Sequence, residues 1–333
     1  MSKKIINFFL IPFDIIFLFL SLVYFKLTKK NLKKTNSSMI RMFCLTGGLS
    51  NDLFSYFTNK KITQEITNEG LNEIDLLKIN QNLNQNGYHV IENFLPKKIC
   101  EEIENHLLSN KLIARGTDMI NEEKEIYYDP LNPSAIIYEM DKDKIFQLES
   151  IQSLIFNQFL LKISENYFKS VPLFDHISLT LSAKSKVPDS KSAQKFHFDL
   201  DRPKWLKYFI YLNDVDENNG PHYFVPATHK NFGIKYEIRS KGYSRIDDEL
   251  IEKHYSNIKK ITGKKGTLII EDTRGLHKGS VVKDNHRSIV LIQFNNSYFG
   301  ENISKFNLSI KNRNNFDFYQ SNKYTYSNLN IKN

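Results

Sequence analysis

The 333-residue sequence predicts a mainly β protein of the α+β class, in which a β-sandwich or barrel carries helices on one face and follows an N-terminal hydrophobic helix. Three observations support this fold class. A largely apolar segment opens the chain, helical patterns continue to about residue 168, and short strands separated by turns make up most of the remainder. Hydrophobic residues form 41% of the chain, which is enough for one sizeable core.

The opening apolar segment covers residues 5–25, about 31 Å of helix at about 1.5 Å per residue, which matches the hydrocarbon core of a bilayer. Lysines flank it on both sides, and more of them follow it than precede it. Since the more basic flank stays in the cytoplasm, we expect residues 1–34 to be a membrane anchor and the downstream domain to be cytoplasmic. Pro12 and Asp14 leave open whether this segment spans the membrane or lies in it.

Residues 35–80 form an adaptor region, in which Met39–Cys44 and Leu53–Phe57 are apolar and residues 63–80 are expected to form two short helices. The remaining residues, 81–333, form one domain. It begins with a strand at 88–93 and a helix from Pro96 to about Ser109, whose apolar residues recur every four positions. A second, longer helix is expected at 148–168, and a charged helix interrupts the later strands at 247–260. We expect strands near 177–184, 194–200, 205–213, 222–225, 266–271 and 287–295.

Charge and cysteine content exclude several classes of protein. The net charge is +9, but the basic residues accompany no zinc-finger, helix-turn-helix or RNA-binding signature, so we expect no nucleic-acid partner. Two cysteines cannot build a disulfide framework and have no metal-binding spacing. The oligomeric state is not indicated by the sequence.

A metal site is predicted by three residues. His197 and Asp199 are two positions apart in a predicted strand, so their side chains point to the same face. His277 follows 80 positions later (277 − 197), just past another apolar strand. Two imidazoles and one carboxylate form the facial triad typical of non-haem Fe(II) oxygenases. His222 and His229 are alternative ligands, but they lie in a turn-rich stretch and we expect them to be structural.

Arg287 opens a strand that is otherwise almost entirely apolar. A guanidinium buried there needs a negatively charged partner, because an unpaired buried charge is costly. An anionic ligand would serve, held through the two-pronged hydrogen bonding that lysine cannot supply. Glu271 or Asp272 is the alternative partner.

The order of these motifs, with residues 218–230 between them, resembles the phytanoyl-CoA dioxygenase family over about residues 80–300. The stretch 86–96 is similar to the opening strand of that family. The resemblance implies a double-stranded β-helix, or jelly roll, in which His197, Asp199 and His277 bind Fe(II). It also implies that Arg287 holds the cosubstrate 2-oxoglutarate and that O₂ is consumed. The expected reaction hydroxylates a small organic or lipid-linked substrate and releases succinate and CO₂.

Further contacts to 2-oxoglutarate are expected from Ser182, Lys184 and Gln194. The first two share the polar face of the strand 178–184, and Gln194 precedes His197 where the family often has a pocket residue. Ile289 stands where the family often has a serine, two positions after the arginine. Two alternatives stay open: a non-catalytic jelly-roll binding module, and a metal-dependent cupin-type enzyme that does not use 2-oxoglutarate. Arg287 counts against both.

Overall fold

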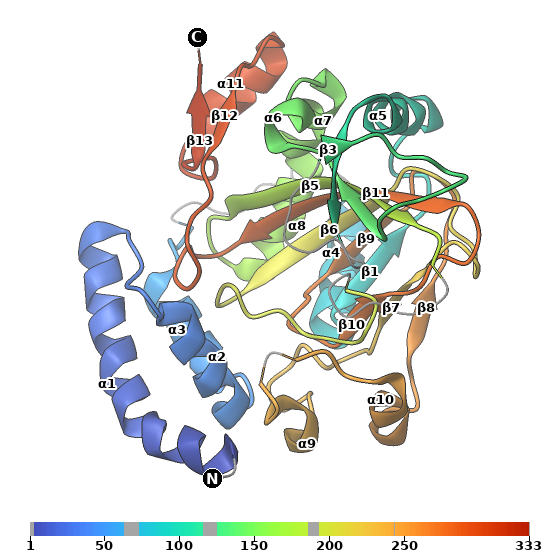
Figure 1. The fold of residues 1–333 in the computed structure, drawn as a ribbon. Coiled ribbons are helices and arrows are strands. Elements are labelled where there is room, and N and C mark those ends of the chain that lie inside the picture. The colour runs from blue at the N-terminus through green and yellow to red at the C-terminus, as the bar shows by residue number, and fades with distance from the viewer. Residues whose placement is uncertain (1–2, 63–72, 116–124, 186–192, 243, 333) are drawn as a thin grey trace.

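The computed structural model describes residues 3–62, 73–115, 125–185, 193–242 and 244–332. Figure 1 shows a central β-structure with helices α5, α6 and α7 at one end, and the N-terminal helices α1–α3 as a separate group at its side. The site residues predicted above belong to the β-structure.

The larger layer is an eight-stranded sheet in which all neighbouring strands are antiparallel. Strands that follow one another in sequence mostly do not pair, so the chain crosses between layers, as in a jelly roll. In spatial order the strands are β1 (Tyr88–Ile91), β9 (Leu268–Glu271), β6 (Trp205–Tyr211), β11 (His286–Asn295), β5 (Leu173–Ala183), β4 (Ile137–Glu139), β2 (Leu112–Arg115) and β3 (Glu125–Ile126).

A three-stranded antiparallel sheet, in the order β10 (His277–Gly279), β7 (His222–Phe224) and β8 (Lys259–Ile261), faces the large sheet. The two sheets share an apolar cluster, to which Phe209 and Ile289 contribute from the large sheet and Phe224 and Ile261 from the small one. The two layers form the double-stranded β-helix core, so the predicted fold class is confirmed.

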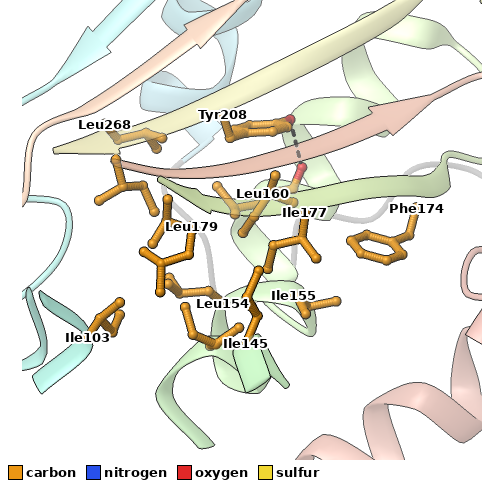
Figure 2. Packing of buried hydrophobic residues seen from close by; sticks show 14 of the residues in the cluster. Ile103, Ile145, Leu154, Ile155, Leu160, Phe174, Ile177, Leu179, Tyr208 and Leu268 are labelled. Carbon is orange, nitrogen blue, oxygen red and sulfur yellow. Dashed lines mark hydrogen bonds between the residues drawn. The ribbon is translucent and has the colours of Figure 1, made fainter. Parts of the chain in front are cut away.

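Helices cover the other face of the large sheet. They are α4 (Glu73–Asn86), α5 (Lys97–Ser109), α6 (Lys142–Ile145), α7 (Glu149–Ile155) and α8 (Gln158–Phe168). Figure 2 shows the packing between these layers, where the Tyr208 hydroxyl and the Ser164 hydroxyl lie 2.7 Å apart. Because strand side chains alternate, Ile177 and Leu179 join this apolar layer while His176 and Ser178 point toward the small sheet. The helices thus leave one face of the large sheet available for a site.

The N-terminal group consists of α1 (Lys3–Thr28), α2 (Thr35–Thr46) and α3 (Leu49–Thr58). The predicted hydrophobic helix is present, and residues Leu10–Thr28 are long and apolar enough to cross a membrane. It is not isolated, however. Asp14, Leu18, Ser21 and Phe25 are buried along one face, at intervals of four, three and four residues. The Asp14 carboxylate accepts hydrogen bonds of 2.7 and 2.6 Å from Arg41 of α2.

The remaining elements are α9 (Tyr236–Arg239), α10 (Asp248–His254), α11 (Arg313–Ser321), and the parallel pair β12 (Phe306–Leu308) and β13 (Leu329–Ile331). Arg239 of α9 donates to the carbonyl oxygen of Cys44, which ties α2 to the β-structure. Asn31, between α1 and α2, donates to the carbonyl oxygens of Tyr298 and Glu301.

Several expected boundaries are wrong. The helix expected at 148–168 is two helices, because the Asn157 side chain caps a new helix by accepting from the Leu160 N–H. The segment expected as a strand at 194–200 makes isolated bridges but no strand. The helix expected at 247–260 ends at His254, and Lys259–Ile261 is strand β8. Of the two helices expected at 63–80, the first lies outside the described residues.

Candidate metal centre

His197 and His277 are brought together by backbone pairing. The His197 N–H donates to the His277 carbonyl at 3.0 Å, and the His277 N–H donates back at 2.9 Å. The Asp199 N–H donates to the Thr273 carbonyl at 2.8 Å, which continues the same pairing. The segment at 197–199 is therefore held beside β10 and the loop before it, although it forms no regular strand.

The three predicted metal ligands form one compact cluster. One ligand atom from each of His197, Asp199 and His277 lies within 4.8 Å of the other two, and all three residues are buried. The Nε2 atoms of His197 and His277 lie 3.8 and 3.5 Å from the two carboxylate oxygens of Asp199. Among the described residues this is the one group of three or more metal-binding side chains that meets this spacing.

The protonation of both imidazoles suits a metal. Nδ1 of His197 lies 3.0 Å from the Lys195 carbonyl oxygen, and Nδ1 of His277 lies 2.9 Å from that of Gly275. A carbonyl oxygen only accepts, so Nδ1 carries a proton in both rings and Nε2 is the nitrogen that faces the cluster. Burial and the neighbouring His277 hold the pKa of His197 well below its ordinary value. Two imidazoles and one carboxylate are the donor set of a divalent iron site.

Lys207 of β6 is a charged neighbour that the sequence did not single out. Its ammonium donates to the Asp199 carboxylate at 2.6 Å. Burial alone raises the pKa of Asp199, but Lys207 and the two imidazoles outweigh burial and hold that pKa well below its usual range. The signal in the sequence was a single lysine within the otherwise apolar run Trp205–Tyr211. Because strand side chains alternate, Lys207 points to the same face as Phe209.

The alternative histidines have other partners. Nε2 of His222 lies 2.8 Å from the Glu271 carboxylate, while its ring stacks on that of His277 with centroids 5.9 Å apart. His229 is buried away from the cluster, and burial lowers its pKa to about 4. Neither belongs to the three-residue cluster, in keeping with the expectation that both are structural.

Arg287 is buried, and burial lowers its pKa. The guanidinium donates to the Gly220 carbonyl oxygen and, at 3.3 Å, to the Ser182 hydroxyl, while its Nε has no partner among the described residues. Glu271 and Asp272 bond instead to His222 and Arg274. No carboxylate within the described ranges lies within 4.0 Å of Arg287, so the guanidinium is a buried cation without an anion.

Glycine makes room for this guanidinium. A Cβ atom added at Gly279 would lie 2.8 Å from Nη2 of Arg287. Gly279 is two residues after His277 on β10, so Arg287 and the metal cluster adjoin the same short strand.

The other residues predicted to contact 2-oxoglutarate lie at different distances from Arg287. Ser182 pairs with Arg287 across β5 and β11 and accepts a hydrogen bond from it. Gln194 is buried and lies near Lys278 and Ser280 in a polar hollow. Lys184 is exposed just beyond the end of β5. Contact of these residues with 2-oxoglutarate stays a prediction.

The sequence profile that describes phytanoyl-CoA dioxygenase matches residues 83–286, which is more than half of the chain and includes all three residues of the cluster. The chain belongs to the phytanoyl-CoA dioxygenase family. The predictions of an Fe(II)- and 2-oxoglutarate-dependent dioxygenase and of an oxidoreductase are confirmed by this membership. No curated protein matches the chain.

Solved structures similar to this member of the phytanoyl-CoA dioxygenase family include three with low sequence identity. The epimerase SnoN, in complex with Fe³⁺, alpha ketoglutarate and nogalamycin RO, is 12% identical, with a TM-score of 0.49 over 67% of this chain and 84% of that one. EctD from S. alaskensis, with 2-oxoglutarate and 5-hydroxyectoine, is 15% identical, with a TM-score of 0.46 over 72% and 82%. HygX from Streptomyces hygroscopicus, with nickel and 2-oxoglutarate, is 12% identical, with a TM-score of 0.45 over 74% and 94%.

Proposed function

We propose that His197, Asp199 and His277 bind Fe(II) and that Arg287 binds the distal carboxylate of 2-oxoglutarate, with O₂ as the third reactant. The observation that carries the proposal is the pairing of two features. A cluster of two imidazoles and one carboxylate adjoins the same short strand as a buried guanidinium without a carboxylate partner within the described ranges. A metal site alone would not need such a cation, so this pairing favours a 2-oxoglutarate-dependent enzyme over a binding module or a cupin-type enzyme.

The bound iron and 2-oxoglutarate would supply oxidative decarboxylation that hydroxylates the substrate and releases succinate and CO₂. The protein's part is to bind and orient. The Lys195 and Gly275 carbonyls hold the two imidazoles in the tautomer that presents Nε2. Lys207 fixes the Asp199 carboxylate, and Ser182 orients the Arg287 guanidinium toward the space beside the cluster. The apolar residues Phe209 and Ile289 exclude water from the inner wall.

Anaerobic Fe(II) titration of the full chain tests this proposal. We expect one Fe(II) per chain, and 2-oxoglutarate should then produce the visible charge-transfer absorption of its iron chelate. His197→Ala, Asp199→Ala and His277→Ala should each weaken Fe(II) binding by more than about 100-fold, since loss of a supporting contact already costs about 10- to 100-fold. His222→Gln is the matched control, because it replaces a buried histidine beside the cluster whose Nε2 bonds to Glu271. Normal iron binding in any of the three alanine variants would remove that residue from the site.

We further propose a division of the chain into an anchor at 1–34, an adaptor at 35–80 and the dioxygenase domain at 81–333. The anchor, together with α3 of the adaptor, would attach the protein to membranes through the outward faces of α1 and α3. Asp14 and Ser21 turn toward the protein, so the outward face of α1 between residues 10 and 25 carries no charge. Large apolar side chains are exposed there: Phe13, Ile15, Ile16, Phe19, Leu20, Val23, Leu49, Leu53, Tyr56 and Phe57.

The basic residues around this face suit lipid headgroups. The Lys26 ammonium lies 5.2 Å from the centre of the Phe57 ring, and that of Lys61 lies 5.1 Å from the centre of the Tyr56 ring. Each such lysine near an anionic surface contributes about 1 kcal/mol. Because α1 packs on α2 and α3 through residues between Asp14 and Phe25, we propose that it lies in one leaflet with the catalytic domain in the cytoplasm.

Flotation of the full chain with phosphatidylcholine vesicles, with and without phosphatidylglycerol, tests this attachment. Binding should persist in about 1 M NaCl, because burial of apolar surface is not screened by salt. Phe19→Glu should reduce binding strongly, whereas Leu131→Glu, which alters an exposed leucine outside this face, should not. Equal binding of both variants would contradict the proposed face.

A further inference from the structure

A polar pocket of about 250 Å³ opens on the side of the metal cluster away from Arg287. Every residue that lines it has a charged or hydrogen-bonding side chain: Asp175, His176, Asp201, Arg202, Lys207, Gln293, Glu301, Asn302 and Ser304. At about 30 Å³ per water molecule, it has the size of a small polar molecule or one ring-sized group. An acyl chain would find no apolar side chain among these nine residues.

The Lys207 side chain lies between this pocket and the metal cluster. Its side chain lines the pocket, and its ammonium lies 2.6 Å from the Asp199 carboxylate. Gln293 pairs with Lys207 across β11 and β6, and it is six positions (293 − 287) from Arg287 on the same strand. That separation is about 20 Å at about 3.3 Å per residue. The metal cluster therefore lies between the pocket and the guanidinium assigned to 2-oxoglutarate.

The pocket's cations are already paired. Arg202 donates twice to Asp175 at 3.0 Å, and Lys207 is held by Asp199. Asp201 and Glu301 make no salt bridge within 4.0 Å to any residue that the structure describes. With Asp175 paired to Arg202 and Lys207 paired to Asp199, Glu301 remains a lining carboxylate without a cationic partner among the described residues. Its charge disfavours phosphate or carboxylate ligands and favours an amine.

Neutral hydrogen-bonding groups complete the lining. Burial lowers the pKa of His176 to about 4, so its imidazole is neutral near pH 7 and offers one donor and one acceptor. The Gln293 amide donates to Asp175 at 2.9 Å, which leaves its carbonyl oxygen and second N–H for a ligand. Such a set of donors and acceptors matches hydroxyl groups.

We infer that this pocket binds the primary substrate through a group that carries hydroxyls and an amine, and not through a hydrocarbon chain. The inference rests on the proposed function, since it places this group beside the iron. It narrows the substrate class to a neutral or cationic polyhydroxylated compound.

Calorimetric titration of the anaerobic Fe(II)- and 2-oxoglutarate-loaded protein tests the inference with three probes: glucosamine, glucose and decanoate. We expect glucosamine to bind with a Kd on the order of 1 mM, glucose to bind about 3- to 10-fold more weakly, and decanoate not to compete with either. Binding of glucosamine should also shift the visible absorption of the iron chelate, because Lys207 joins the pocket to Asp199.

Two variants locate the binding. Gln293→Leu should weaken the binding of both sugars by about 3- to 10-fold, which is the effect of losing a hydrogen bond. Glu301→Gln should weaken the binding of glucosamine but not that of glucose. Glu252→Gln, which removes an exposed carboxylate outside the pocket, is the matched control and should change neither.

The inference is overturned if glucosamine does not bind at any soluble concentration, if decanoate binds more tightly, or if both pocket variants bind glucosamine like the parent protein. Failure of Fe(II) or 2-oxoglutarate to bind would instead refute the proposed function. The charge-transfer absorption, which is recorded before any probe is added, separates these two failures.

Discussion

Replacement of Arg287 tests the link between the buried guanidinium and 2-oxoglutarate. Arg287→Lys keeps the positive charge but loses the paired N–H donors, and Arg287→Ala loses both. Arg287 is buried and has no carboxylate partner within the described ranges, so in our proposal the 2-oxoglutarate carboxylate is the anion that pairs with it.

The expected loss of 2-oxoglutarate affinity follows from the burial of Arg287. Removing one partner of a buried, hydrogen-bonded charge pair costs about 2–5 kcal/mol, or about 30- to 4,000-fold in affinity at 1.4 kcal/mol per factor of ten. Arg287→Ala should therefore raise the Kd for 2-oxoglutarate within this range. Arg287→Lys should raise it less, because one charged donor remains.

Calorimetry with 2-oxoglutarate on the anaerobic Fe(II)-loaded protein measures this effect, and Fe(II) affinity is recorded for the same samples. Fe(II) binding should stay near normal, because Arg287 contacts none of the three proposed ligands. Arg313→Ala is the matched control, since Arg313 is 81% exposed on α11. Unchanged 2-oxoglutarate affinity in Arg287→Ala would refute the assignment of this strand to the cosubstrate.

Three further predictions concern packing, ionisation and stability. Gly279→Ala should weaken 2-oxoglutarate binding about 10-fold at constant Fe(II) affinity, because its Cβ would lie 2.8 Å from the Arg287 guanidinium; calorimetry measures both. Arg41→Leu should lower the free energy of unfolding by about 1–3 kcal/mol in denaturant titrations. This loss is smaller than that expected on breaking a fully buried ion pair, because Arg41 is 32% exposed. Adding Asp14→Leu should restore stability. His229 has a pKa of about 4 when folded and about 6.5 when unfolded, so only the unfolded state gains its proton between these values. Stability should therefore fall as pH decreases below about 6.5, and His229→Gln should show a shallower fall.

The residues of the metal cluster could be predicted from the sequence because their signal is local. The two-residue spacing of His197 and Asp199 sets their common orientation, and His277 follows an apolar strand, β9, that the sequence also predicts. The strands β5, β6, β7, β9 and β11 were predicted for the same reason, since alternation and apolar runs are visible within each segment. Element ends were less predictable, as the Asn157 cap shows, because one side-chain hydrogen bond decides whether a helix continues.

Contacts between distant segments were decided by the tertiary structure alone. The sequence left open whether Arg287 pairs with Glu271 or Asp272, and both carboxylates are occupied by other residues. It also left Asp14 as a charge in an apolar helix, and only the packing of α1 on α2 supplies Arg41 as its partner.

The sequence by itself determined a β-sandwich or barrel with helices on one face, the three metal-binding candidates and the hydrophobic N-terminal helix, because side-chain periodicity and residue type carry this information within short segments. The jelly-roll form was implied by the resemblance to the phytanoyl-CoA dioxygenase family. The tertiary structure decided the role of Lys207, the polar pocket and the direction in which α1 turns Asp14. These features depend on which strands become neighbours, and that choice comes from burial of the whole core. No single segment encodes it.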